Sequence, residues 1–190
     1  MISIASESDA SLVSYAAIST AFEVHEVVDV GALQADMPTL PTRPVSPTWL
    51  KDYDALAGND PPSWPAKYGI RHWCFLAAYI KDVRVGGAVV VVRQEDVAQL
   101  GGRASFALLW DLRVAQSHRR QGVGRALLAQ ADVTARDAGC RGVEVETQDV
   151  NVPACRLYAA AGFRLHEVTP FAYSAAPREI RLIWQKTIDW

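Results

Sequence analysis

A loop rich in glycine and arginine carries the clearest chemical signal in this sequence of 190 residues. It reads Arg119-Arg120-Gln121-Gly122-Val123-Gly124-Arg125, and it lies between an apolar run at 108 to 114 and an Ala- and Leu-rich stretch. A strand, a turn and the start of a helix are therefore predicted. Free N–H groups at a helix start attract anions, glycines let the backbone approach a ligand, and arginines add fixed positive charge. The loop predicts a pocket for a phosphate or pyrophosphate.

Two motifs together carry a resemblance to a known family. The loop lacks the Gly-Lys-Ser/Thr ending of the nucleotide P-loop and the spacing of the dinucleotide fingerprint. It matches the Arg/Gln-x-x-Gly-x-Gly/Ala loop of the GNAT N-acetyltransferases, although a helix start with chance glycines is the simpler alternative. The second motif, Asn151-Val152-Pro153-Ala154-Cys155-Arg156-Leu157-Tyr158-Ala159-Ala160-Ala161-Gly162-Phe163, fits the family's Asn-x-x-Ala-x-x-x-Tyr-x-x-x-Gly-Phe pattern. Over residues 70 to 186 the chain thus resembles the GNAT superfamily.

A narrower resemblance is to the streptothricin acetyltransferase branch of that superfamily. It rests on the run from Glu146 to Cys155, on Phe171-Ala172-Tyr173 and on Leu182-Ile183-Trp184. That branch acetylates an amine on the lysine-like side chain of an antibiotic. The resemblance therefore implies a small-molecule amine as the acceptor.

The same resemblance implies the fold class, which is α/β with one GNAT domain over residues 1–190. Residues 1–70 would form a variable acceptor-side region and residues 71–190 the acetyl-CoA-binding core. The mixed central sheet would be an antiparallel meander followed by a βαβαβ unit, flanked by helices. A V-shaped split would separate the family's fourth and fifth strands, here 105–114 and 142–147.

Periodicity of the apolar residues predicts where the elements lie. Strands are predicted at 22–30, 72–80, 84–93, 105–114, 142–147, from 163 and at 180–184, and helices at 49–56, 122–138 and 152–160. Four prolines, Pro38, Pro41, Pro44 and Pro47, predict a loop before the first helix. A polar loop is predicted at 94–104, and Gly86-Gly87 is a candidate bulge.

Acetyl-CoA is the acetyl donor that the resemblance implies. The residues implied to contact it are Leu112, Arg113, Val114, Arg119, Arg120, Gln121, Gly122, Val123, Gly124, Arg125, Asn151, Ala154 and Tyr158. Tyr158 is also the implied general acid, because a phenol with a pKa of about 10 can protonate the departing thiolate. Core packing is the alternative for Tyr158, and helix capping by Asn151 is compatible with a cofactor contact.

The proton acceptor has no obvious candidate on the central strand. Side chains of a strand alternate, so Leu108, Trp110 and Leu112 are expected on the acceptor side and Asp111 on the other. None of the first three can take a proton. Glu144 and Glu146 share a face of the next strand, and one of them would act through water or attract a cationic acceptor. Glu146 is the catalytic candidate of the two, and bulk water is the alternative base.

Aromatic residues supply the remaining candidates for acceptor binding. Trp110 would pack against the acceptor or hold a cation over its ring, and Tyr173 would form part of the acceptor wall together with Glu146. Simple core packing is the alternative for both rings. No metal site is predicted, because the three cysteines, Cys74, Cys140 and Cys155, are scattered without a CxxC spacing.

Two rival functions are a non-catalytic CoA-binding module and a protein N-terminal acetyltransferase. The intact Tyr158 argues against the first, whereas the missing base on the central strand leaves it open. The second needs an open groove for a peptide, whereas the Pro- and Trp-rich segment at 38 to 65 would instead cover the acceptor site.

Composition excludes several other classes. A chain of 190 residues, half of them apolar, suits one domain with a full core. Its net charge of −2 argues against a general nucleic-acid binder. There is no apolar run long enough for a membrane span, and acids stand where a signal peptide needs bases. We therefore expect a cytoplasmic protein without nucleic-acid or membrane partners, with a homodimer left open.

Overall fold

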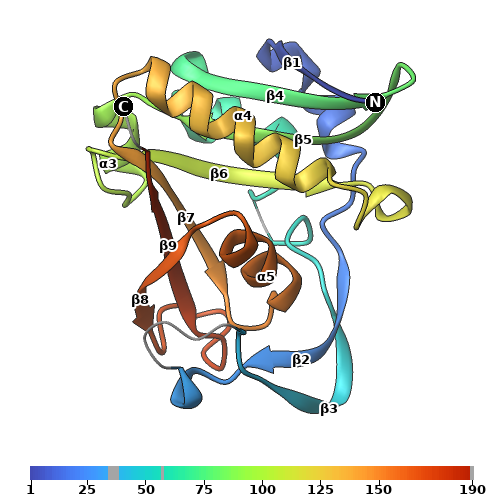
Figure 1. Ribbon diagram of the computed structural model, residues 1–190, viewed down its shortest axis with the longest axis vertical. Coiled ribbons are helices and arrows are strands. Elements are labelled where there is room, and N and C mark those ends of the chain that lie inside the picture. Colours follow the sequence, from blue (N-terminus) through green and yellow to red (C-terminus); the bar gives the residue numbers. More distant parts are fainter. Residues whose placement is uncertain (34–38, 57, 189–190) are drawn as a thin grey trace. The chain divides into compact units, whose positions relative to one another are not determined.

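The computed structural model describes residues 1–33, 39–56 and 58–188 (Figure 1). The strands are β1 (Ile2–Glu7), β2 (Phe22–Val28), β3 (Thr42–Lys51), β4 (Trp73–Ile80), β5 (Val83–Val91), β6 (Ala107–Val114), β7 (Gly142–Gln148), β8 (Arg164–Thr169) and β9 (Arg181–Thr187). The helices are α1 (Leu12–Ala16), α2 (Trp64–Lys67), α3 (Gln94–Gln99), α4 (Val123–Asp137) and α5 (Val152–Ala160). Short 3-10 turns join several of them.

The chain forms two compact units. One consists of Met1–Ala21, Asp52–Glu144 and Thr187–Trp190, and the other of Phe22–Lys51 and Val145–Lys186. Hydrogen-bonded strands follow the order β1-β4-β5-β6-β7-β9-β8, and β2 pairs with β3 separately. This order confirms the predicted α/β class with a mixed central sheet.

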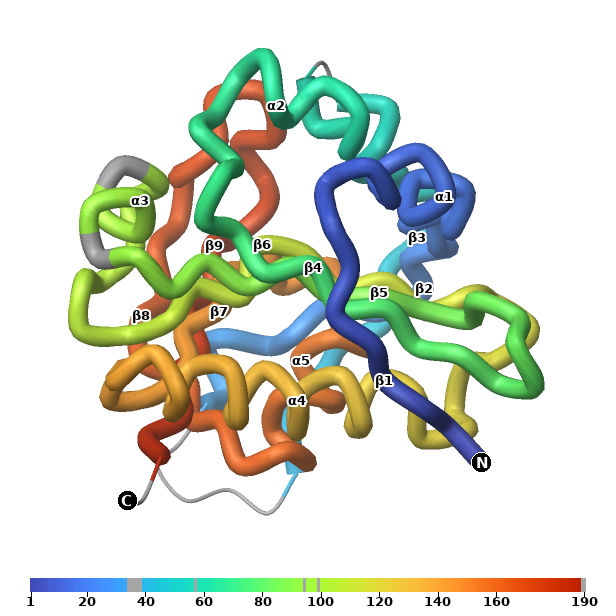
Figure 2. The backbone as a smooth tube through the Cα atoms, turned by 90° about the horizontal axis from the view of Figure 1, so that it is seen from above, coloured from blue at the N-terminus to red at the C-terminus, as the bar shows by residue number. Residues whose placement is uncertain are grey.

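The first unit holds the antiparallel part of the sheet. β4 pairs with β1 on one side and β5 on the other, and β5 pairs with β6. β7 begins parallel to β6, with Ala107 opposite Val143 and Leu108 opposite Glu144. Figure 2 shows α4 on one side of β4, β5 and β6, and α1 and α2 on the other. The sheet is therefore covered on both faces.

Two adjacent glycines of β5 make room for these two layers. A Cβ on Gly86 would meet Val123 and Leu127 of α4, at 3.0 and 3.3 Å. A Cβ on Gly87 would meet the Tyr15 ring at 2.6 Å. Each glycine thus lets a different layer come close to the strand.

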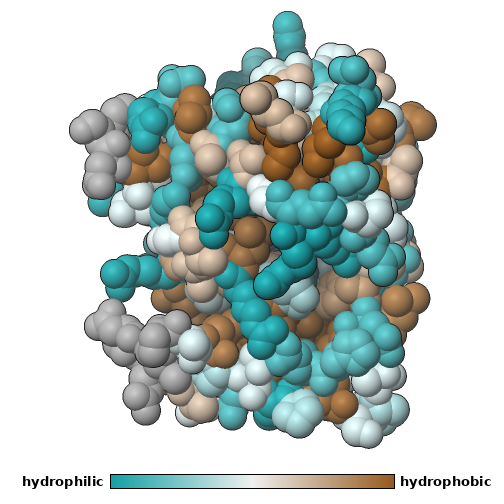
Figure 3. All heavy atoms as spheres, turned by 45° about the vertical axis from the view of Figure 1, so that its right-hand side comes forward, coloured by the Kyte–Doolittle hydropathy of each residue, from teal (hydrophilic) through white to brown (hydrophobic). Residues whose placement is uncertain are grey.

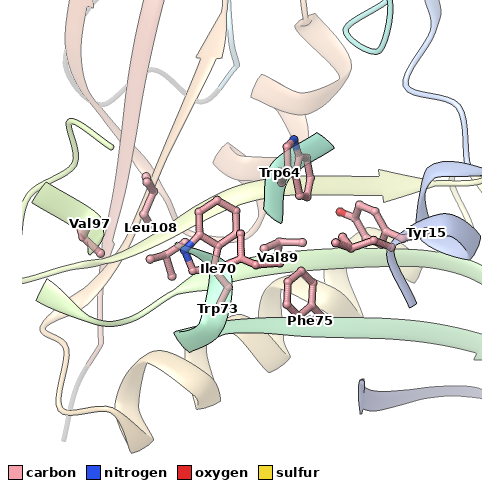
Figure 4. Packing of buried hydrophobic residues seen from close by; sticks show 10 residues of the cluster. Tyr15, Trp64, Ile70, Trp73, Phe75, Val89, Val97 and Leu108 are labelled. Atoms are coloured by element: carbon pink, nitrogen blue, oxygen red, sulfur yellow. The ribbon is translucent and has the colours of Figure 1, made fainter. Parts of the chain in front are cut away.

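An aromatic core fills the face opposite α4. Its buried members are Leu12, Tyr15, Trp64, Ile70, Trp73, Phe75, Val89, Val91, Val97 and Leu108. Figure 4 shows these side chains spread along β4, β5 and β6. Helix α4 covers the opposite face with buried side chains three or four positions apart, which are Val123, Leu127, Leu128, Ala131 and Ala135. Gly139, with a φ of 75°, follows the end of this helix.

The second unit holds β7, β9 and β8, with β8 antiparallel to β9. Helix α5 contacts β8 and β2. A small core of Val24, Val27 and Val150 joins β2 to the chain after β7. Asp149 accepts a hydrogen bond from the Ile180 N–H at 2.8 Å, which fixes the chain entering β9.

Most predicted elements are confirmed, with small shifts in their ends. The turn between β4 and β5 is made by Lys81 and Asp82, both with positive φ. The bulge expected at Gly86-Gly87 lies one residue earlier, because the register skips Val85. β1 and α1 were not predicted, and the polar loop expected at 94–104 contains the short helix α3.

The proline-rich segment was predicted wrongly. Pro44 and Pro47 lie inside β3 rather than in a loop, and the helix expected at 49–56 is replaced by the end of β3 at Lys51 and turns. β3 pairs with β2 alone, and the register between them shifts near Val24 and Glu26. Edge strands and bulges tolerate prolines, because the missing N–H is not needed there. Pro38 lies outside the described residues.

The surface carries scattered exposed apolar residues. On the face shown in Figure 3, hydrophilic side chains lie between the hydrophobic ones. None of the described helices has both the length and the apolar character required to cross a membrane.

Candidate active site

The glycine- and arginine-rich loop leads into α4. Gly122 precedes the helix with a φ of 89°, a left-handed conformation that glycine adopts without strain. Among the described residues, no side chain caps this helix start. The N–H groups of the first turn therefore lack a side-chain acceptor, and their binding of an anion stays a prediction.

The arginines of this loop have different surroundings. Arg119 is partly buried and donates to the backbone oxygens of Val114 and Ala21, at 3.2 and 3.5 Å. Arg120 and Arg125 are exposed. Arg119 therefore holds the loop against β6, while the other two guanidinium groups can meet a ligand.

A bulge in β6 changes which side chains share a face. Val89 pairs with Asp111 and Val90 with Leu109, so Trp110 is an extra residue in the strand. After the bulge, each side chain of β6 therefore lies on the face of the sheet opposite to the one expected from simple alternation starting at Trp110. Asp111 lies on the face that carries Trp110 and Tyr15, and Leu112 lies on the α4 face opposite Ala88. The predicted grouping of Leu108, Trp110 and Leu112 on one face was wrong for this reason.

Arg113 lies at the centre of a buried ion-pair network. Its Nε donates to Asp111 at 2.7 Å, and its terminal nitrogens donate to Asp54 at 3.1 and 2.8 Å and to the Ile18 carbonyl at 3.3 Å. The guanidinium lies over the Tyr15 ring, 5.0 Å from its centroid. Burial raises the pKa of Asp111, and the charge of Arg113 opposes that rise. The side chain of Arg113 is thus engaged within the first unit, and the predicted contact of Arg113 with the cofactor stays a prediction.

Trp110 belongs to a cluster of aromatic rings. Its centroid lies 5.2 Å from that of Tyr68, 5.3 Å from that of Trp73 and 6.2 Å from that of Trp64. Trp110 and Tyr68 are both partly exposed. The ring of Trp110 therefore packs on the core and also presents surface.

Helix α5 carries the predicted general acid. The Asn151 side chain accepts a hydrogen bond from the Ala154 N–H at 3.2 Å, so the capping role expected for Asn151 is present. Tyr158 is buried, with ring centroids 5.7 Å from Phe163 and 6.5 Å from Trp184. The neighbouring thiol of Cys155 is no rival nucleophile, because burial raises its pKa to about 12.

The two predicted acceptor residues of the second unit are in contact. The hydroxyl of Tyr173 donates to Glu146 Oε1 at 2.9 Å and accepts from Gln148 Nε2 at 2.8 Å. Glu146 is exposed. Glu144, in contrast, is buried and receives hydrogen bonds from Arg103, so it serves the structure of the first unit. Glu146 is thus a solvent-facing carboxylate whose position is fixed by a neighbour.

Four residues of these sites were not predicted. Asp54 had been placed in a helix, and Tyr15, Tyr68 and Gln148 had no assigned role. Each is brought to its site by tertiary contacts with residues far along the chain, which leave no mark in the local sequence pattern. Among the described residues no group of three or more His, Cys, Asp or Glu is placed to hold a metal ion. The three cysteines are free thiols.

Comparison with known proteins gives the family. The profile described as "Acetyltransferase (GNAT) family" matches residues 45–163. A streptothricin acetyltransferase of Escherichia coli is 32% identical over 166 residues, which cover 86% of this chain and 83% of that protein. Streptothricin acetyltransferase A of Bacillus subtilis (strain 168) is 40% identical over 81 residues, 42% of this chain and 47% of that protein; in this match the chain spans about half of the relative.

Solved structures share the fold over almost the whole chain. A nourseothricin acetyltransferase has a TM-score of 0.74 and 25% identity, with 99% of each chain covered. A protein from Bacillus anthracis str. Ames, solved in complex with acetyl coenzyme A, has a TM-score of 0.76, with 99% of this chain and 100% of the other covered. Its 21% identity supports the fold alone. With the family profile and the Escherichia coli relative, these findings show that the chain belongs to the GNAT acetyltransferase family and is an N-acetyltransferase whose donor is acetyl-CoA.

Proposed function

We propose that this enzyme acetylates a primary amine of a small molecule, with a streptothricin-type antibiotic as the first acceptor to test. The observation that carries this proposal is the similarity to the Escherichia coli streptothricin acetyltransferase, which extends over 86% of the chain. The chain's own acceptor candidates support it, since Glu146 is a solvent-facing carboxylate that Tyr173 holds in place.

The loop before α4 would hold the pyrophosphate of the donor. Its backbone N–H groups, the exposed Arg120 and Arg125, and the left-handed Gly122 suit a doubly charged ligand. The proposed cofactor-binding residues are Leu112, Arg113, Val114, Arg119, Arg120, Gln121, Gly122, Val123, Gly124, Arg125, Asn151, Ala154 and Tyr158. Acetyl-CoA supplies the thioester-bound acetyl group.

Tyr158 would be the general acid. In the reaction a C–N bond forms to the acceptor and the C–S bond breaks, so the nitrogen loses a proton to water and the sulfur needs one; water then returns a proton to the phenol that donated it. The phenol of Tyr158 would supply that proton as a general acid. The tight ring packing around Tyr158 would hold its hydroxyl in a fixed direction.

Glu146 would attract the acceptor while it is still an ammonium ion. A carboxylate held by the Tyr173 hydroxyl at 2.9 Å keeps its second oxygen for another donor. Water would carry the ammonium proton away before the neutral amine attacks. Tyr173 would be a positioning residue, since it acts through Glu146.

Thiol release from acetyl-CoA with a panel of amines tests the proposal. The panel contains streptothricin, lysine, polyamines and short peptides with free N-termini. We expect streptothricin to give the highest kcat/KM. If peptides react far faster, the acceptor proposal is wrong and the enzyme is a peptide N-acetyltransferase; if no amine of the panel releases thiol, the proposed acceptor class is wrong.

Glu146→Gln separates acceptor binding from the other steps. We expect KM for the acceptor to rise about tenfold, because a charge-assisted hydrogen bond contributes about 1.5–3 kcal/mol before solvent screening. Calorimetric affinity for CoA should be unchanged. Glu23 on β2 provides the matched Glu23→Gln control, because it is exposed and accepts a hydrogen bond from the Thr48 hydroxyl at 2.9 Å, as Glu146 does from the Tyr173 hydroxyl.

A further inference from the structure

We propose that Gln148 is a positioning residue for acceptor binding, which acts through Tyr173 on Glu146. Its side-chain amide would set the direction of the Tyr173 hydroxyl, and thereby the lone pairs that Glu146 presents to an acceptor. This inference rests on the proposed role of Glu146 and adds a residue to which the sequence assigned no role.

The three side chains form a chain of hydrogen bonds within the second unit. Glu146 and Gln148 are two positions apart on β7, so their side chains leave the same face of the strand. The Tyr173 hydroxyl lies between them, 2.9 Å from Glu146 Oε1 and 2.8 Å from Gln148 Nε2. Gln148 and Tyr173 are partly buried and Glu146 is exposed, so the carboxylate is the end of this chain that faces solvent.

The donors and acceptors of these groups fix the direction of both hydrogen bonds. An amide nitrogen only donates, a carboxylate only accepts, and a phenol can do both. Gln148 therefore donates to the phenol oxygen, and the phenol O–H is left for Glu146. If the amide were turned round, its oxygen would compete with Glu146 for the single phenol hydrogen. The amide of Gln148 thus commits that hydrogen to Glu146.

The backbone around Gln148 gives this amide a fixed base at the end of β7. The Gln148 carbonyl accepts from the Asn151 N–H at 3.0 Å, and the Asp149 N–H donates to the Ile180 carbonyl at 3.0 Å. The neighbours of Gln148 on either side, Thr147 and Asp149, are both buried. The position of the amide is therefore set by contacts that are independent of any acceptor.

The loop that carries Tyr173 is held in a different way. Two consecutive turns link Tyr173 to Glu179: the Ala176 N–H donates to the Tyr173 carbonyl at 3.2 Å, and the Glu179 N–H donates to the Ala176 carbonyl at 3.0 Å. Glu179 is in turn paired with Lys51 at 2.6 Å, and these side chains are 13% and 12% exposed. These contacts place the ring of Tyr173, but its hydroxyl hydrogen can still rotate about the C–O bond. The Gln148 amide removes that freedom.

The expected consequence concerns acceptor binding rather than acetyl transfer. A solvent-facing glutamate loses rotational freedom when it binds a ligand, and this loss weakens the binding. A hydroxyl that already points at Glu146 orders the carboxylate before the acceptor arrives. Loss of the Gln148 amide should therefore raise KM for the acceptor and leave kcat unchanged.

A double-mutant cycle tests this inference in the thiol-release assay, with the amine of the panel that gives the highest kcat/KM. Gln148→Met keeps the length of the side chain and removes its donor. We expect KM for the acceptor to rise about threefold, as for loss of one neutral hydrogen bond, with kcat and CoA affinity unchanged. In a Tyr173→Phe background, Gln148→Met should raise KM no further, because it acts through the hydroxyl.

Gln130→Met on α4 is the control, since Gln130 is also partly buried, and it should keep the wild-type KM. An unchanged KM in Gln148→Met, or an equal rise with and without the Tyr173 hydroxyl, would overturn the inference. A fall in kcat at constant KM would do the same, because it would place Gln148 in the chemical step.

The outcome for Gln148 is separate from the outcome for the proposed function. If a peptide reacts best, the small-molecule proposal is wrong, and the cycle run with that peptide still decides the role of Gln148. If no amine reacts, the proposed acceptor class is wrong, and nuclear magnetic resonance decides instead. The side-chain amide signals of Gln148, identified by their loss in Gln148→Met, should shift in Tyr173→Phe; unchanged signals would show that the amide does not direct the hydroxyl.

Discussion

Replacing Arg113 with methionine tests how far the central strand depends on its buried ion pairs. The wild-type side chain donates to Asp111 at 2.7 Å, to Asp54 at 3.1 and 2.8 Å and to the Ile18 carbonyl. Methionine keeps the apolar stem but carries no charge. The variant therefore leaves two partly buried carboxylates without their cation.

The expected loss of stability follows from the exposure of the three side chains. Removing one partner of a buried ion pair costs about 3–5 kcal/mol. Asp54 and Asp111 are 22% and 17% exposed, so water relieves part of this penalty and favours the lower limit, about 3 kcal/mol. In a chain of this size, 1 kcal/mol shifts Tm by about 2–4 °C. We therefore expect Tm to fall by about 6–12 °C.

The loss of stability in Arg113→Met should become smaller as the pH falls. Burial raises the pKa of Asp111, and Arg113 counteracts this in the wild type. Without Arg113, the pKa of Asp111 in the folded state rises further above its unfolded value. Such a carboxyl stabilises the fold at low pH and loses this contribution as the pH rises through its folded pKa. The difference between wild type and variant should therefore shrink on mild acidification.

Thermal unfolding followed by circular dichroism, at neutral and at mildly acidic pH, measures both effects. Arg156→Met is the matched control, because Arg156 binds Glu26 in a similar two-pronged pair that is 47% and 32% exposed. Such a surface pair contributes about 0–1 kcal/mol. Equal decreases in Tm for the two variants would refute the reasoning. So would a decrease in Tm for Arg113→Met that is larger at mildly acidic pH than at neutral pH.

Three further predictions concern the donor site, the general acid and the sheet. Gly124→Glu should abolish measurable CoA binding in calorimetry, because it puts bulk and negative charge at the pyrophosphate loop; unchanged affinity in a folded variant rejects that site. Tyr158→Phe should keep CoA affinity and lose about 10²–10⁴-fold in single-turnover rate, and full turnover would show that the thiolate leaves unaided. Gly87→Ala should cost about 1–3 kcal/mol in denaturant unfolding, because its Cβ would lie 2.6 Å from Tyr15, whereas Gly69→Ala, with open space around it, should not.

Local patterns predicted the regular elements because each depends on residues close in sequence. The helix α4 follows from apolar spacing and from the glycines at its two ends, and the hairpin of β4 and β5 from two apolar runs around Lys81-Asp82. β3 was missed because prolines normally argue against a strand. Its place at the edge, which makes them tolerable, is a tertiary property that local composition does not carry.

The parts of the candidate site in which a sequence motif fixes the backbone could be predicted. The parts in which side chains far apart in the sequence come into contact were harder to predict. The loop from Arg119 to Arg125 and the cap at Asn151 are local, and both have the expected conformation. The face of Asp111 depends on one extra residue in β6, and strict alternation cannot anticipate it. The pairing of Glu146 with Tyr173 joins residues 27 positions apart, so the sequence identified both without showing that they touch.

The segment that carries β2 and β3 leaves the first unit and returns to it at nearly the same point. Thr20, just before the segment, donates from its N–H to Asp54 at 3.3 Å and from its hydroxyl to Asp52 at 3.4 Å, just after it. When the two ends of an insertion are fastened together, the length between them adds little to the entropy of closing the loop. The hydrogen bonds of Thr20 to Asp52 and Asp54 therefore close the first unit across the point at which β2 and β3 leave it, so this unit's own ordering depends little on the length of the segment between them.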